Sequence, residues 1–157
     1  MAEIAMITPK KLQLRGKPMA KNKTNYTDKD VIGFINEIEN EKRRAETLII
    51  LDLYKDITRF EPKMFGPTII GFGNYNYKYE SGHEGNAPLA AFSPRKNSLV
   101  FYLEPAFENR EELLLNLGKI RTSKACIYAR KLENIDLQIL REMISKSIEK
   151  TKEKYPN

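Results

Sequence analysis

The sequence is poor in the residues that build most metal and redox sites. Its 157 residues include one Cys, one His and no Trp. One Cys cannot form a disulfide within the chain. One Cys and one His are also too few for a Cys-rich zinc site, for an iron–sulfur cluster held by four thiolates or for a site that needs two histidines. No apolar run approaches the roughly 20 residues of a membrane-spanning helix. We therefore expect a soluble, cytoplasmic domain with no membrane association, in which the lone thiol stays reduced.

Positive charge is unevenly distributed along the chain. The formal net charge is +6, and residues 1–27 hold six basic side chains against one acidic side chain. Residues 28–157 hold 21 basic against 20 acidic side chains. We predict a basic flexible leader over residues 1–23, without the apolar stretch of a secretory signal, and a single domain over residues 24–157. Because this domain is nearly neutral, we do not expect it to bind nucleic acid, whereas the leader has the charge to do so.

Apolar spacing predicts helices at both ends of the domain and strands between them. Thr27 and Asp30 resemble a capping box, which predicts a helix over about 28–44, and a second helix is expected over about 46–59. Strands are expected over about 66–79, 89–93, 99–103 and 125–129, with further helices over 108–117 and after Asn134. The order ααβββαβα predicts an α+β fold with a single antiparallel sheet covered by helices on one face.

A tyrosine-rich stretch is the most informative local feature. In an unbroken strand Gly71, Gly73, Tyr75, Tyr77 and Tyr79 would share one face, because side chains alternate along a strand. The glycines would leave a gap beside three phenols, where a ligand could approach closely. Aromatic residues on strands more commonly pack beneath a helix, so packing is the competing interpretation.

Other reactive residues lack a recognisable motif. His83 lies in a glycine-flanked loop with Glu80 and Glu84, which is a solvated turn unless the three converge on a cation. Cys126 alternates with Tyr128 in an apolar stretch, which predicts a buried, inert thiol. We identify no catalytic residues.

Cations recur in the loops that the sequence predicts around the sheet. An anion could be held there if these loops meet at one end, although cations after a helix also complement its dipole. The residues are Arg95, Lys96, Lys119, Arg121, Lys124, Arg130 and Lys131.

An ordered series of motifs resembles the bacterial YdhG-like family of domains of unknown function. The motifs are residues 64–73 (MFGPTIIGFG), 81–85 (SGHEG), 92–96 (FSPRK), 117–119 (LGK) and 123–128 (SKACIY), together with the three tyrosines. The resemblance covers roughly residues 24–147. It implies a small cytoplasmic α+β domain and supplies no catalytic residues. Phe65 stands where the family pattern has Trp, and His83 stands where Arg is commoner.

Some members of the wider YdhG-like group resemble frataxin-type iron chaperones. Such proteins hold iron on a ridge of surface carboxylates. The resemblance would assign this role to Glu37, Glu39 and Glu41, with Glu46 nearby. Cations at positions 42–44 interrupt that stripe.

Three functional hypotheses follow from the sequence. The first is a non-catalytic accessory domain that binds a small molecule or protein and needs no cofactor. The alternatives are a frataxin-like iron carrier and a nucleic-acid binder that uses the basic leader. The residues of the first hypothesis are Gly71, Gly73, Tyr75, Tyr77, Tyr79, Arg95 and Lys96.

Overall fold

A computed structural model describes residues 25–156 of the chain, so the predicted leader lies outside the described residues. The strands are β1 (Lys63–Phe65), β2 (Ile69–Phe72), β3 (Tyr75–Lys78), β4 (Glu84–Ala87), β5 (Ala90–Pro94), β6 (Leu99–Tyr102), β7 (Arg121–Thr122) and β8 (Cys126–Ala129). The helices are α1 (Val31–Asn36), α2 (Glu41–Thr58), α3 (Arg110–Leu117) and α4 (Leu137–Lys154), with a 3-10 turn at Leu132–Asn134.

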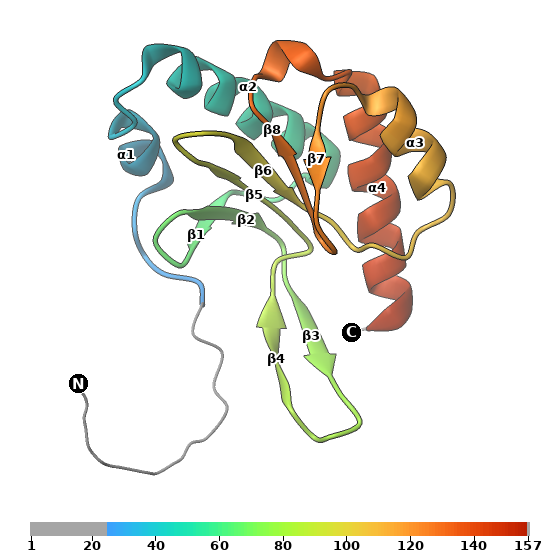
Figure 1. Ribbon diagram of the computed structural model, residues 1–157. Coiled ribbons are helices and arrows are strands. Elements are labelled where there is room, and N and C mark those ends of the chain that lie inside the picture. The colour runs from blue at the N-terminus through green and yellow to red at the C-terminus, as the bar shows by residue number, and fades with distance from the viewer. Residues whose placement is uncertain (1–24, 157) are drawn as a thin grey trace, which may run out of the picture.

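One antiparallel sheet forms the centre of the molecule. Its six strands follow the order β1-β2-β5-β6-β8-β7, and β3 and β4 pair only with each other in a hairpin that extends from one end of the sheet (Figure 1). The α+β class and the antiparallel sheet predicted from the sequence are confirmed. The strand pattern is more finely divided than predicted, since the stretch expected as one strand over 66–79 contributes to two separate sheets.

Helices α2 and α4 pack on the same face of the sheet (Figure 1). Alternate strand residues point into this layer, and Tyr54, Phe72, Phe92 and Phe101 are among its fully buried side chains. The Tyr54 ring lies 5.2 Å from that of Phe72 and 5.0 Å from that of Phe92. Its hydroxyl donates a hydrogen bond to the Ala91 carbonyl at 3.2 Å, and burial raises its pKa. The single hydrophobic core therefore lies between the sheet and these two helices.

The opposite, outer face of the sheet has no helix over it among the described elements (Figure 1). Tyr26 covers part of β1 and β2: its ring packs on Phe65 at 5.2 Å and its hydroxyl donates to the Gly73 carbonyl. Cys126 and Tyr128 also lie on this face and are half-buried, whereas Ile127 between them is in the core. The predicted alternation at Cys126 is thus right, but the prediction of a buried thiol is wrong because the buried face is the other one.

The first two helices differ from their predicted bounds. Asp30 caps α1 by accepting a hydrogen bond from the Gly33 amide at 2.9 Å, and α1 ends at Asn36. Asn40 then caps α2, accepting from the Arg43 amide at 2.9 Å. A side chain that satisfies the free amides of a new first turn starts a new helix. The predicted helix over 28–44 is therefore wrong, because Asn40 divides it.

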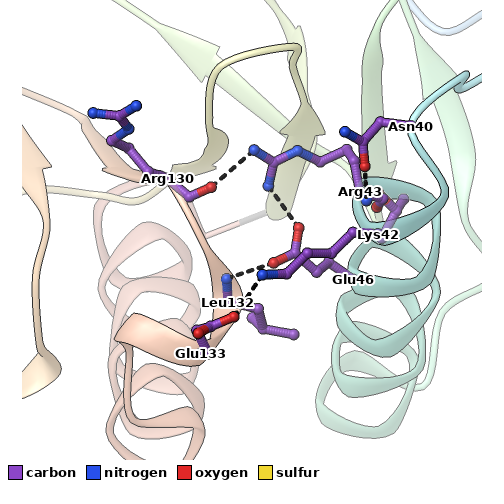
Figure 2. A network of polar contacts seen from close by, with 8 residues as sticks. Asn40, Lys42, Arg43, Glu46, Arg130, Leu132 and Glu133 are labelled. Carbon is purple, nitrogen blue, oxygen red and sulfur yellow. Dashed lines mark hydrogen bonds and ion pairs between the residues drawn. The ribbon is translucent and has the colours of Figure 1, made fainter.

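A buried ion pair ties α2 to the chain that follows β8 (Figure 2). Arg43 Nη1 lies 2.9 Å from Glu46 Oε1, and Arg43 Nη2 donates to the Arg130 carbonyl at 2.9 Å. The second carboxylate oxygen of Glu46 accepts from the Leu132 amide at 2.8 Å. At the exposed rim of the network, Lys42 pairs with Glu133 at 2.6 Å, and this hydrogen bond lowers the pKa of Glu133 and raises that of Lys42.

Candidate functional site

The stretch from Gly71 to Tyr79 bends instead of continuing as one strand. Gly71 belongs to β2, and Gly73 just after it has a φ of 72°, a conformation that side chains other than glycine's rarely adopt. The chain leaves the sheet there, so Tyr75 and Tyr77 lie on β3 and Tyr79 lies in the turn between β3 and β4. The predicted unbroken strand is wrong for this reason.

The gap expected beside the two glycines is filled. A Cβ atom on Gly71 would lie 2.8 Å from the Pro88 side chain and 3.0 Å from the Tyr26 hydroxyl. A Cβ atom on Gly73 would lie 2.9 Å from the Phe60 ring. These glycines therefore allow close packing by their neighbours and do not open a cavity at their own positions.

The hairpin carries a row of aromatic rings. The ring of Tyr77 lies 6.2 Å from that of Tyr75 and 5.3 Å from that of Tyr79. His83 stacks on Tyr79 at 5.9 Å, and Tyr155, just after α4, stacks on Tyr75 at 5.3 Å. The three tyrosines share a face as predicted, and that face is only partly buried because no helix covers the hairpin.

His83 packs against this row of aromatic rings. The imidazole lies against Tyr77 and Tyr79, while Glu84 pairs with Lys78 at 3.9 Å. Two of the three loop residues considered for a cation site, His83 and Glu84, therefore have separate partners.

A pocket of about 260 Å³ lies at the base of the hairpin. Its walls come from the outer face of the sheet, the hairpin base, the loop after β6 and the C-terminal half of α4. Most of the lining is apolar, and five of the lining residues have side chains with a polar group. The main lining residues are Phe65, Ile69, Tyr75, Ala87, Pro88, Ala91, Tyr102, Leu103, Glu104, Ala125, Ser147 and Thr151.

Two phenols in this pocket stay protonated at neutral pH. Burial raises the pKa of Tyr75 to about 12, and neighbouring groups that include Tyr155 and Glu104 act in the same direction. Burial also raises the pKa of Tyr102, against the opposing effect of Arg95, whose Nη2 donates to the Tyr102 hydroxyl at 2.8 Å. Both hydroxyls therefore remain neutral hydrogen-bonding groups beside apolar walls.

The one carboxylate of the pocket is held by its surroundings. Glu104 Oε1 accepts hydrogen bonds from Lys154 Nζ at 3.1 Å and from the Ala106 amide at 3.2 Å. The Glu104 amide donates to the Ser147 hydroxyl at 2.7 Å, which fixes the loop against α4. Its charge is balanced by Lys154, so the pocket offers oriented polar atoms with little net charge.

Only part of the predicted site is brought together. Tyr75 lines the pocket, but Arg95 and Lys96 occupy the turn after β5, at the end of that strand remote from the hairpin. Arg95 reaches the pocket only through its contact with Tyr102. Reading the sequence missed Glu104, Ser147 and Tyr102, because no local pattern indicates that residues so far apart in the chain share a cavity.

The proposed carboxylate ridge does not form as a set. Glu37 follows α1, Glu39 lies in the linker and Glu41 begins α2, and all three are exposed. Glu37 pairs with Lys29 at 3.6 Å, and Glu46 is in the buried ion pair with Arg43. Within residues 25–156, no three His, Cys, Asp or Glu side chains are grouped so that they could hold a metal ion.

Comparisons with known proteins identify no relative. No protein-family model matches the chain, and neither curated proteins nor solved structures give a match. Over the described part of the chain, no helix combines the length and the apolar character needed to cross a membrane.

Proposed function

We propose that the protein is a cytoplasmic, non-catalytic domain of the YdhG-like type that binds a small molecule in the pocket at the hairpin base. The observation that carries this proposal is the pocket itself, whose mostly apolar lining includes Tyr75 and Tyr102. Ligand sites combine an apolar lining with a few polar groups that orient the ligand. The α+β architecture and the motif series support the family assignment within this proposal.

The pocket favours a small and largely apolar ligand. Its volume of about 260 Å³ is below the roughly 300–1,000 Å³ typical of sites for drug-sized molecules. A single ring system or a short aliphatic chain fits this space and gains free energy from burial against Ile69, Ala91 and Leu103. A hydroxyl or carbonyl on the ligand would accept a hydrogen bond from a phenol, since both phenols are protonated.

Thermal unfolding in the presence of small probes tests this proposal. Indole and 1-hexanol serve as neutral probes, with hexanoate and hexylamine as charged ones. A ligand that binds only the folded state raises the unfolding midpoint, so the neutral probes should raise it more than the charged probes. Tyr75→Phe removes a donor and should weaken binding by about two- to tenfold.

A plugged pocket supplies the control. Ala125 lines the pocket and is exposed, so Ala125→Trp should fill the site without disturbing the core. Ala45→Trp places the same side chain at an exposed position on α2. The neutral probes should stabilise Ala45→Trp and the unaltered chain, and should not stabilise Ala125→Trp. An equal response of all three proteins would show that the pocket is not the binding site.

A further inference from the structure

Strands β5 to β8 and the turns and segments beside them carry basic residues, and two stretches of this part of the chain contain no acidic residue. Residues 85–103 and 113–132 include β5, β6, β7 and β8 with their turns, and they contain seven basic and no acidic side chains. All seven basic side chains are exposed. Within residues 25–156 none of them forms an ion pair, although most other regions of the surface hold paired charges.

Strand register places Arg121 on the face that carries Tyr102 and Tyr128, and Arg95 and Arg130 lie just beyond the ends of β5 and β8. Arg121 is directly opposite Tyr128, with its guanidinium carbon 4.6 Å from the centre of that ring. Arg95 contacts the Tyr102 hydroxyl. Arg130 directly follows β8, and Figure 2 shows its side chain directed away from the Arg43–Glu46 pair.

Turn residues extend this surface at both ends. Lys96 lies in the turn between β5 and β6, and Lys124 lies in the turn between β7 and β8. The acidic residues that directly follow the two stretches in sequence are already paired, Glu104 with Lys154 and Glu133 with Lys42. The result is a sheet face without a helix over it, on which two half-buried tyrosines lie beside exposed arginines that form no ion pair within the described residues.

We infer that this face binds single-stranded nucleic acid. Arginines bind phosphate oxygens through charge-assisted hydrogen bonds, and unpaired bases stack on aromatic rings or on guanidinium planes. Tyr128 with Arg121 and Tyr102 with Arg95 supply both kinds of contact on adjacent strands. A flat sheet face suits a splayed-out single strand, whereas the major groove of a duplex is read by an inserted helix or β-ribbon.

The small net charge of the domain does not indicate that one of its faces is basic. Residues 28–157 have a nearly balanced charge, which led us to expect no nucleic-acid binding by the folded part. The sum is small because the acidic residues lie on other elements, above all the segments before β1 and after β8. Charge on a face, not the total, determines whether phosphates are attracted.

Fluorescence anisotropy with the full-length chain tests the inference. The probes are labelled oligouridylate, labelled oligothymidylate and a labelled duplex of the same length. Arg121→Gln/Arg130→Gln should weaken single-strand binding about tenfold and reduce the slope of log affinity against log salt by about 1.4, corresponding to two lost phosphate contacts. Lys55→Gln/Lys152→Gln removes the same charge from α2 and α4 and should leave both values nearly unchanged.

The aromatic contribution has its own pair of variants. Tyr128→Leu should weaken binding about tenfold by removing a stacking surface, whereas Tyr128→Phe should bind like the unaltered protein. Unfolding midpoints of all variants establish that the fold is intact. A preference between oligouridylate and oligothymidylate would show whether RNA or DNA is favoured, and either preference supports the inference.

A variant in which the six basic residues of the leader are replaced by Gln separates the leader's contribution to binding from that of the sheet face. These are Lys10, Lys11, Arg15, Lys17, Lys21 and Lys23. This variant should retain a binding signal that still depends on Tyr128. The inference is overturned if the unaltered protein does not bind, if the duplex binds more tightly, or if binding disappears with the leader cations and ignores Arg121→Gln/Arg130→Gln. It is also overturned if polyglutamate binds as tightly and Tyr128→Leu has no effect, since that result would indicate a face for acidic proteins.

Discussion

Two glycines with positive φ show how differently single residues are constrained. Gly118, at the end of α3, has a φ of 134°, and a Cβ atom there would lie 2.1 Å from the Asn134 carbonyl oxygen. Gly82, at the tip of the hairpin, has a φ of 93° and no neighbouring atom within 4 Å of such a Cβ. A side chain at Gly118 is therefore disfavoured both by the backbone conformation and by lack of space, whereas a side chain at Gly82 is disfavoured by the backbone conformation alone.

Alanine substitution at these two positions should therefore have unequal effects. Gly82→Ala should lower the free energy of unfolding by about 1–2 kcal/mol, the ordinary cost of positive φ for an L-residue. Gly118→Ala should lower it by more than about 3 kcal/mol, because the chain that follows β8 must also move. Denaturant unfolding measures both values. Equal losses would contradict the close approach of Asn134 to Gly118.

At the scale of elements, helix α2 is joined to the β8–α4 connection by polar groups buried beneath the surface. Glu46 accepts from Arg43 and from the Leu132 amide, and the side chains of the ion pair are about one-tenth exposed. Lys42 and Glu133 join the same two elements at the surface, where solvent screens their interaction. The same two elements are therefore joined by one buried polar network and by one exposed ion pair.

Removing one partner from each pair should separate the two contributions. Glu46→Ala leaves the Arg43 guanidinium and the Leu132 amide buried without their acceptor, and it should lower the free energy of unfolding by about 3–5 kcal/mol. Glu133→Ala should have a far smaller effect. Urea unfolding of the two variants gives the comparison. A loss for Glu133→Ala as large as that for Glu46→Ala would show that the buried network does not hold these elements together.

For the whole molecule, the eight tyrosines report on folding at alkaline pH. Burial raises the pKa of Tyr26 and of Tyr75 to about 12, above the usual value of 10, and raises that of Tyr54 as well. Since the unfolded chain loses these protons first, the stabilisation is fully present below pH 10 and is lost as the pH rises from 10 to 12.

Phenolate absorbance and circular dichroism, followed together, measure this behaviour. Tyr54 should ionise only together with unfolding, because burial raises its pKa. Tyr26→Phe should make the loss of stability between pH 10 and 12 less steep, because one raised pKa has been removed. Ionisation of Tyr26, Tyr54 and Tyr75 near pH 10, with the fold intact, would contradict the burial of these side chains.

Much of the local structure could be predicted because it depends on nearby residues. Side-chain alternation correctly predicts that Tyr75 and Tyr77 share one face of their strand, and that Cys126 and Ile127 lie on different faces of theirs. The short helix predicted before Gly118 corresponds to α3. Helix bounds were less predictable, since the Asn40 side chain competes with helix continuation through a hydrogen bond that apolar spacing does not reveal. Which face of a strand is buried was not predictable at Cys126, because that depends on where α2 and α4 pack.

The amino-acid sequence alone determined the class of the fold, the scarcity of metal-binding residues and the acid-free composition of the β5–β8 segments, since these follow from residue types and short-range order. Only the tertiary structure decided that Pro88 and Phe60 fill the space at the glycines, that Tyr75 and Glu104 share a pocket, and that Arg95 and Arg121 contact the two tyrosines of one sheet face. Such groupings depend on strand pairing between distant segments. Pairing is selected by the burial of the whole core, which no local pattern encodes.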